Sequence, residues 1–169
     1  MVLTITDNFA ESEVGGKARV LQTLHSQGYS VPAFVVLPVS SVHEFSVEDG
    51  QLVSEVQNAL QSDSYAVRSA ALLEDTAESA MAGQFSTKLA VKPSELTAAV
   101  QAVIDQAKTV AGFSIGKLSV IIQEFVEPDY AGVLFTRNPV GGYEQVCEYV
   151  AGRGEQVVSG QRVQKTFFY

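Results

Sequence analysis

The sequence is short of the residue types that cross-link a chain or give it positive charge. Its 169 residues include one cysteine, Cys147, and no tryptophan, and 11 lysines and arginines stand against 19 aspartates and glutamates. A single cysteine can form neither an intrachain disulfide nor a cysteine-based zinc site, so a reducing compartment, the cytoplasm, is expected. The net charge of -8 would repel phosphate backbones and anionic lipids. We therefore expect neither nucleic acid nor a membrane as a partner.

Long hydrophobic runs are also missing. The longest apolar stretch, 31–39, contains two prolines and is far shorter than the roughly 20 residues that a membrane helix needs. The first residues, MVLTITDNFAESE, have no basic start, so a signal peptide is not expected. What the chain does have is 46% apolar residues and 18% charged ones. This composition is typical of one folded domain with a sizeable core rather than of a disordered chain.

The spacing of apolar residues predicts helices that alternate with strands early in the chain and strands that cluster late. Helices are expected at 15–27, 40–45, 48–60 and 93–111, and strands at 2–6, 33–37, 65–68, 85–91, 118–126, 132–136, 145–150 and 161–169, the last as an edge strand. Within 85–91, alternate residues from Phe85 to Val91 are expected on one side. Residues 69–83 are expected to form an ordered loop. Together these elements predict an α+β (mixed α/β) fold with mixed, partly antiparallel sheets flanked by helices.

Two glycines and a lysine, Gly15-Gly16-Lys17, open the first predicted helix. Glycines let the backbone approach an anion closely, the N–H groups at a helix start favour negative charge, and Lys17 adds a cation. The segment is not a Walker A loop, which would need glycine at Glu11 and serine or threonine at Ala18. Taken alone, it fits a flexible helix start with a solvated lysine better than a phosphate site.

An arginine, Arg68, ends the apolar strand that begins at Tyr65. Its planar guanidinium suits phosphate oxygens at the edge of a sheet. It could equally form an ion pair with one of the nearby acids Glu74, Asp75 and Glu78. The spacing of these residues leaves both interpretations open.

Two further segments have both a ligand-binding and a structural interpretation. The small residues of 79–84 could fold over phosphates as an anion-binding nest, or could form an ordinary turn before the next strand. The apolar segment 121–126 could present backbone groups to a purine, or could be a core strand that meets a turn. In both cases the structural interpretation is the commoner one. Cys147, His25 and His43 have no sequence partner that suggests a nucleophile and its base.

In order and wording, these segments resemble the N-terminal nucleotide-binding domain shared by phosphoenolpyruvate synthase, pyruvate phosphate dikinase and rifampin phosphotransferase. The resemblance runs through VGGKARVLQTLHSQGYSVPAFVVLP at 14–38, YAVRSAALLEDTAESAMAGQFSTKLAV at 65–91 and IIQEFVEPDYAGVLFTRNPVGG at 121–142. A weaker likeness follows in EYVAGRGEQVVSG at 148–160. The resemblance implies an ATP-grasp-like fold that binds MgATP between two lobes. In the family, this site transfers phosphoryl groups from ATP to a histidine on a separate domain.

The resemblance also implies roles for the phosphate-facing residues. Lys17 and Arg68 match the family's phosphate-binding lysine and arginine. Gly83 matches its flap, and Thr87 matches the strand behind that flap. Cations and N–H dipoles at these positions would offset the charge of the phosphates.

At the other end of the nucleotide, Gln123 matches the strand that links the two lobes, and the backbone of 124–126 would contact adenine. Glu155 matches the glutamate of a G-x-G-E turn and would reach the nucleotide. ATP and Mg²⁺ are the cofactors that the resemblance implies. The residues that would hold the metal stay unassigned, with Glu74, Asp75 and Glu78 as candidates.

The chain also departs from the family. It lacks the family's strand pair that bears acidic residues, a glutamine and an arginine, and it lacks the phosphohistidine domain. We therefore expect 1–169 to be a single nucleotide-binding-like domain, C-terminally incomplete relative to the family, with 1–91 and 92–169 as two small lobes. Its expected function is ATP binding as a dikinase-like phosphotransferase component that is not a complete enzyme alone. The alternative is a non-catalytic interaction module, which would expose apolar surface to a partner domain, a subunit or a second copy.

Overall fold

The computed structural model describes residues 2–47, 50–71, 87–110, 114–154, 157 and 165–168. The chain forms two compact units, Met1–Phe125 and Val126–Tyr169. The structure therefore divides the chain after Phe125 and not after Val91. The reason is that the segment between these two residues supplies a helix and the central strand of the first unit's sheet.

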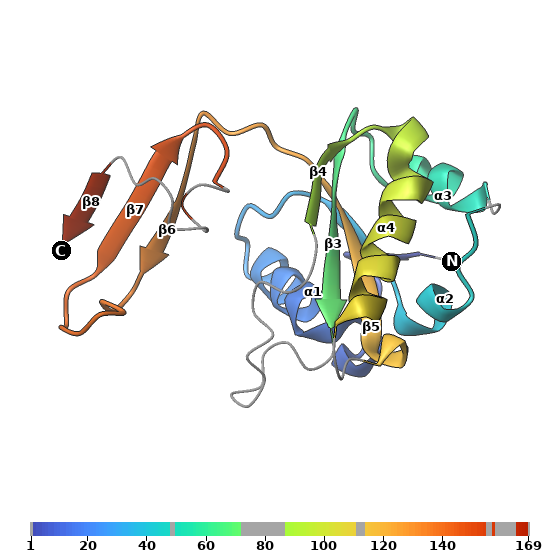
Figure 1. Ribbon diagram of the computed structural model, residues 1–169, viewed down its shortest axis with the longest axis horizontal. Coiled ribbons are helices and arrows are strands. Elements are labelled where there is room, and N and C mark those ends of the chain that lie inside the picture. Colours follow the sequence, from blue (N-terminus) through green and yellow to red (C-terminus); the bar gives the residue numbers. More distant parts are fainter. Residues whose placement is uncertain are drawn as a thin grey trace. The chain divides into compact units, whose positions relative to one another are not determined.

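The first unit is built on a five-stranded sheet (Figure 1). Its strands are β1 (Leu3–Thr4), β2 (Phe34–Leu37), β3 (Tyr65–Ala71), β4 (Thr87–Val91) and β5 (Leu118–Glu124), in the order β1-β2-β5-β3-β4. Every described pair is antiparallel. β2 and β3 run in the same direction, but β5 lies between them, so no parallel ladder forms. The expected α+β class is confirmed, and the parallel pairing expected within it is not found among the described strands.

Helices cover both faces of this sheet, with α1 and α4 on opposite sides of β3 (Figure 1). The helical segments are α1 (Glu11–Ser26), α2 (Val39–His43), α3 (Gln51–Ala59), α4 (Leu96–Thr109) and the short 3₁₀ turns η1 (Pro93–Glu95) and η2 (Ile115–Lys117). Strand β2 shows why both faces need cover, because all four of its residues are buried. Val35 and Leu37 join the cluster under α2, α3 and α4, whereas Phe34 and Val36 join the cluster under α1. A strand buried on both faces needs a continuous apolar run rather than an alternating one.

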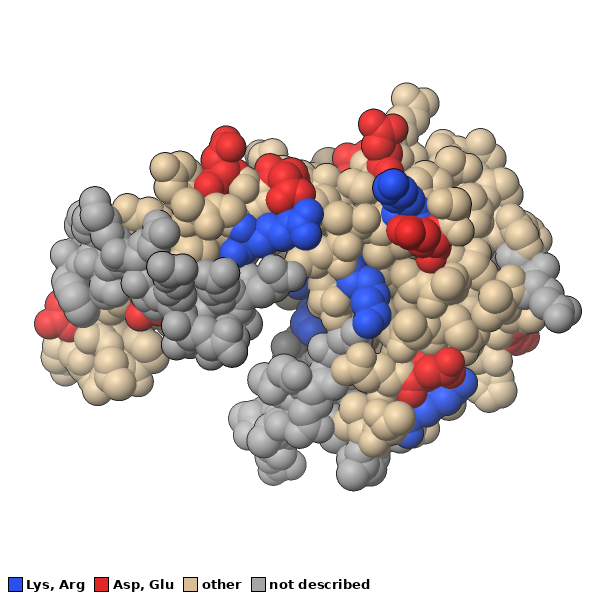
Figure 2. Space-filling view, turned by 45° about the horizontal axis from the view of Figure 1, so that its top comes forward, with Lys and Arg blue, Asp and Glu red and all other residues tan. Residues whose placement is uncertain are grey.

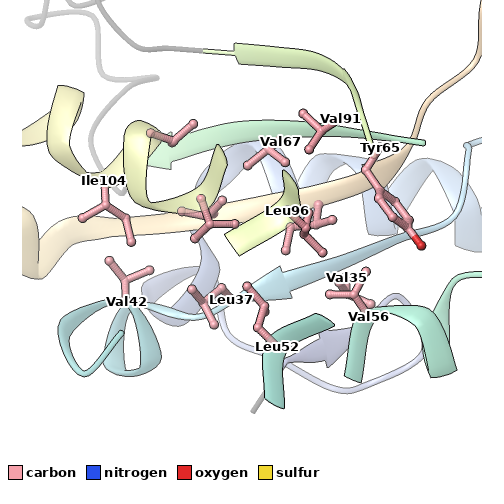
Figure 3. Packing of buried hydrophobic residues seen from close by; sticks show 14 of the residues in the cluster. Val35, Leu37, Val42, Leu52, Val56, Tyr65, Val67, Val91, Leu96 and Ile104 are labelled. Atoms are coloured by element: carbon pink, nitrogen blue, oxygen red, sulfur yellow. The ribbon is translucent and has the colours of Figure 1, made fainter. Parts of the chain in front are cut away.

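The larger core lies between the sheet and α2, α3 and α4 (Figure 3). Helix α4 contributes the buried stripe that the sequence predicted, Leu96, Val100, Val103, Ile104 and Ala107. Each valine, leucine or isoleucine of this stripe stabilises the fold by about 1.5–3 kcal/mol through removal from water. The face of the sheet under α4 is therefore a packed core.

Strand β4 contains a bulge that the sequence did not predict. Thr87 pairs with Arg68 and Val91 pairs with Tyr65. Arg68 and Tyr65 lie on opposite faces of β3, because alternate residues of a strand point to opposite faces. Thr87 and Val91 therefore also face opposite sides, and the expected one-sided alternation is wrong. The cause lies at Ala90, whose φ of 54° marks the extra residue in β4.

Strand β3 is longer than expected, since it continues to Ala71. The expected loop at 69–83 therefore begins later, and residues 72–83 lie outside the described residues. Helix α3 begins at Gln51 rather than at the expected residue 48. The other helices and strands lie within a few residues of their expected positions.

The second unit is an antiparallel sheet in the order β6-β7-β8, formed by β6 (Tyr130–Phe135), β7 (Val146–Ala151) and β8 (Lys165–Phe168). Strand β8 lies at an edge, as expected. Arg153 joins the start of this unit to the turn after β7, with its Nε 2.8 Å from Glu127 Oε1 and its Nη2 2.6 Å from Glu127 Oε2. These hydrogen bonds hold the pKa of Glu127 below its usual value. None of the helices in the described ranges is long and apolar enough to cross a membrane.

Candidate functional site

Lys17 and Arg68 are far apart in the sequence but line the same pocket. The pocket has a volume of about 250 Å³, and Val20 and Leu21 complete its described lining. It lies on the α1 side of the first unit's sheet, where Lys17 comes from α1 and Arg68 from β3. Both side chains are half-buried. The structure thus brings together the two cations that the sequence analysis singled out.

A break in α1 positions Lys17. Gly15 has φ 76° and ψ 165°, which is not helical, so the helix restarts at Gly16 directly before Lys17. A residue with a Cβ adopts such a conformation only at a cost, which explains a glycine at this position. The N–H groups of a restarted helix lack partners within the helix. The glycine pair therefore does more than loosen a helix start, because it sets a second helix start beside the pocket.

Ser119 of β5, which was not among the predicted site residues, fixes this break against the sheet. The buried Ser119 hydroxyl lies 2.6 Å from the carbonyl oxygen of Val14 and 3.0 Å from that of Ala70. One hydroxyl therefore links α1, just before its break, with β3 and β5. The signal that could have revealed it is a serine within the apolar run LSVII, because a buried polar group needs a specific partner.

Arg68 is held by its place in the sheet. It lies opposite Thr87 of β4 on one side and Ile121 of β5 on the other. Its guanidinium makes no hydrogen bond or ion pair with the part of the chain that the structure describes. The acids that are its alternative partners, at positions 74, 75 and 78, lie outside that part.

Of the other four predicted site residues, two lie in the described part of the chain and two do not. Thr87 is exposed and shares a face with Arg68, because directly paired residues of neighbouring strands point to the same side. Gln123 lies on the same face of β5 as Ile121. Neither Thr87 nor Gln123 belongs to the described lining of the pocket. Gly83 and Glu155 lie outside the described residues.

The described contacts of Gln123 are structural. Its side chain is 93% buried (7% exposed), and its Nε2 donates a hydrogen bond of 3.0 Å to the carbonyl oxygen of Pro32. The next backbone N–H groups are also engaged: Glu124 N donates to the Ala33 carbonyl over 2.9 Å, and Phe125 N donates to the Ser64 carbonyl over 3.0 Å. A purine that contacts this strand end would therefore have to use other groups than these two N–H donors.

A second hollow borders α1, but its polar groups serve the fold. It has a volume of about 450 Å³ and lies between the loop after β1 and the helix. Gln22 Nε2 donates to the carbonyl oxygens of Ile5 and Asp7 over 3.0 and 2.7 Å, and Arg19 Nη1 donates to Gln22 Oε1 over 2.6 Å. These groups already satisfy one another. The pocket lined by Lys17 and Arg68 is the candidate site, because it joins the two cations that the sequence predicts to bind phosphate.

The electrostatics of this pocket favour an anion. Basic side chains are few and scattered on the face shown in Figure 2, and the whole chain carries -8. An anion in a pocket that two basic side chains line is attracted to both of them. A phosphate chain suits the arrangement, because a guanidinium can hold two phosphate oxygens at once.

The described residues do not provide a metal site. Within the described ranges no three His, Cys, Asp or Glu side chains are grouped to hold a metal ion. The described lining of the pocket includes no carboxylate, although Mg²⁺ prefers oxygen ligands. The described residues that line this pocket thus supply no ligand for Mg²⁺.

Comparison with known proteins identifies the class to which the chain belongs. The family described as pyruvate phosphate dikinase, AMP/ATP-binding domain, matches residues 51–169. A probable phosphoenolpyruvate synthase of Methanothermobacter thermautotrophicus is 33% identical over 135 residues, which are 69% of this chain and 20% of that protein. Rifampicin phosphotransferase of Streptomyces sviceus is 30% identical over 136 residues, 71% of this chain and 16% of that protein. The prodigiosin synthesizing transferase of Serratia marcescens is 36% identical over 116 residues, 62% of this chain and 13% of that protein.

These matches define a nucleotide-binding domain of a phosphotransfer family. In particular, the chain belongs to the pyruvate phosphate dikinase AMP/ATP-binding domain family, whose match covers more than half of it. The resemblance found in the sequence is thereby confirmed. Arg68, Thr87 and Gln123 lie inside the matched range, and Lys17 precedes it. The chain spans a fifth or less of the length of these three relatives.

Proposed function

We propose that the pocket between α1 and β3 binds the phosphate groups of ATP, and that the chain acts as the ATP-binding part of a phosphotransferase that is not complete alone. The observation that carries this proposal is that Lys17 and Arg68 line one pocket. Membership of an AMP/ATP-binding family supports it. The cytoplasm, expected from the single cysteine, is the location we propose.

In this proposal each basic residue has a separate task. The guanidinium of Arg68 donates hydrogen bonds to two phosphate oxygens in a fixed plane, whereas the ammonium of Lys17 acts as a point charge. The helix start after Gly15 supplies backbone N–H groups nearby. Because all three interact with phosphates, affinity should rise with the number of phosphates, from AMP through ADP to ATP. Gly83, Thr87, Gln123 and Glu155 stay predictions as further nucleotide contacts.

Calorimetric titration with ATP, with and without Mg²⁺, tests the proposal. Removing one charge-assisted contact costs about 1.5–3 kcal/mol, so Arg68→Ala should weaken binding roughly 10- to 100-fold. Lys88→Ala is the matched control, because Lys88 is exposed and lies opposite Val67, which faces the α4 core. The affinity of the Lys88→Ala variant for ATP should equal that of the unchanged protein.

Two results would contradict the proposal. One is the absence of any heat or thermal shift at about 5 mM ATP. The other is an equal loss of affinity in Arg68→Ala and Lys88→Ala, which would indicate a general charge effect. Analysis of the nucleotide after the titration adds one distinction: ATP consumed during the titration would exclude the non-catalytic alternative, whereas intact ATP fits both a binding module and a component that is not complete alone.

A further inference from the structure

Among the described strands of the second unit, β6 lies at an edge of the sheet and carries none of the usual protective residues. It stands at the end of the order β6-β7-β8 and pairs with β7 alone among the described strands. Its sequence, YAGVLF, contains no charged residue and no proline. Natural proteins commonly place such residues on edge strands to prevent pairing with another chain. An unprotected edge of this kind is a template for one more strand.

The hydrogen-bond pattern shows which residues face outward. Gly152 N donates to the Asp129 carbonyl oxygen over 2.8 Å, in line with the ladder between β6 and β7. Inward and outward residues alternate along an antiparallel strand. The N–H and C=O groups of Tyr130, Gly132 and Leu134 therefore point away from β7. The side chains of Tyr130 and Leu134 are 68% and 59% exposed.

We propose that this edge pairs with the same edge of a second copy of this chain, in antiparallel orientation. The outward residues then pair with one another around Gly132, and Tyr130 lies opposite Leu134 of the second copy. This register satisfies outward N–H and C=O groups of the strand and sets two exposed apolar side chains together on the same face. A register shifted by two residues towards the start of the chain would bring in Pro128, which has no N–H to donate.

Charge at the two ends of β6 selects the orientation. Glu127 and Asp129 precede the strand and Arg137 follows it. An antiparallel pair brings Arg137 of one copy to the acidic end of the other, whereas a parallel pair would set like charges together. These groups also have contacts within their own chain, since Arg153 binds Glu127 and the Arg137 guanidinium lies 4.9 Å from the centre of the Tyr143 ring. Such a self-complementary edge fits a second copy with two-fold symmetry, which closes at a dimer.

The first experiment uses the unchanged protein. One strand pair buries little surface compared with a standard interface, so a weak equilibrium is expected. Sedimentation from about 10 µM to about 1 mM should show a shift from 18.1 kDa to twice that mass. Over the same range, amide exchange should slow at Tyr130, Gly132 and Leu134. A monomer at every concentration, growth beyond a dimer, or unchanged exchange at these amides would overturn the proposal.

The second experiment tests the register. A chain with Tyr130→Lys and Leu134→Lys places like charges opposite each other and should remain a monomer. A chain with Tyr130→Lys and Leu134→Glu loses the same apolar side chains but places opposite charges together, so the dimer should return and weaken with added salt. A dimer in the first chain, or a monomer in the second, would contradict this register.

A control and a check on folding complete the design. Tyr29→Lys removes a tyrosine that is 62% exposed in the first unit and should leave the dimer unchanged. Gly132 is left in place, because a Cβ there would come within 2.5 Å of the Glu148 carbonyl oxygen and disturb β7 itself. The affinity for ATP, measured in parallel, should be equal in all variants, since none of them touches Lys17 or Arg68.

Discussion

At the scale of residues, the buried hydroxyl of Ser119 joins the elements that carry the candidate site. Ser119 is fully buried in an otherwise apolar strand, and its hydroxyl reaches carbonyl oxygens of α1 and β3. The Val14 carbonyl lies just before the break at Gly15, where α1 leaves its helical path. Ser119 therefore acts as a positioning residue, because it holds the helix start that carries Lys17 against the strand that carries Arg68.

Ser119→Ala should destabilise the protein. Removing the hydroxyl leaves two buried carbonyl groups without this donor, at a cost of about 1–3 kcal/mol in the free energy of unfolding. Ser54→Ala is the matched control, because its hydroxyl also donates to a backbone carbonyl, that of Gln51, over 2.8 Å, but on the surface. Ser54→Ala should change the free energy of unfolding by no more than about 0.5 kcal/mol. Urea unfolding of both variants gives the comparison, and equal effects would show that the Ser119 contact is not special.

The sequence allowed some residue-level expectations and hid others. Lys17 and Arg68 could be paired because charged groups in an apolar, acidic chain stand out and because the surrounding motifs resemble a family. The side-chain hydrogen bond from Gln123 to the Pro32 carbonyl could not be anticipated. It depends on which loop passes beside β5, and only the assembled sheet decides this.

At the scale of elements, the periodicity of apolar residues predicts the buried face of α4 but not the bulge in β4. Helix α4 matches its expected stripe because each of its residues advances by the same rotation along the helix. β4 does not match, because one alanine with positive φ reverses the faces of the residues on either side of it. Alternation in the sequence carries no sign of an extra residue when that residue is not glycine.

Ala90→Gly should stabilise the protein, because glycine adopts the φ of 54° without the steric cost that alanine bears. The expected gain is about 0.5–1 kcal/mol, smaller than the full strain since glycine also has more freedom in the unfolded chain. The same substitution at Ala102, exposed within α4, should instead destabilise by about 1 kcal/mol. Thermal or urea unfolding of the two variants checks the opposite signs, and a loss of stability in both would contradict the strain at Ala90.

At the scale of the whole molecule, the position of β5 decides the boundary between the units. β5 follows β4 and α4 in the chain but lies between β2 and β3 in the sheet. The expected division after Val91 would remove the strand to which both β2 and β3 are hydrogen-bonded. Local patterns cannot reveal such pairing, because the partners of β5 lie far from it in sequence.

The central position of β5 predicts which fragments of the chain fold on their own. A fragment of residues 1–125 keeps both core clusters and both Lys17 and Arg68, so it should unfold cooperatively and retain ATP binding that depends on these two cations. A fragment of residues 1–91 retains β2 and β3 but exposes their inner edges and the apolar surface that β5 and α4 covered. It should therefore show neither a cooperative transition by circular dichroism nor ATP binding. Equal folding of the two fragments would mean that β5 is dispensable, and loss of folding in residues 1–125 would mean that the second unit stabilises the first.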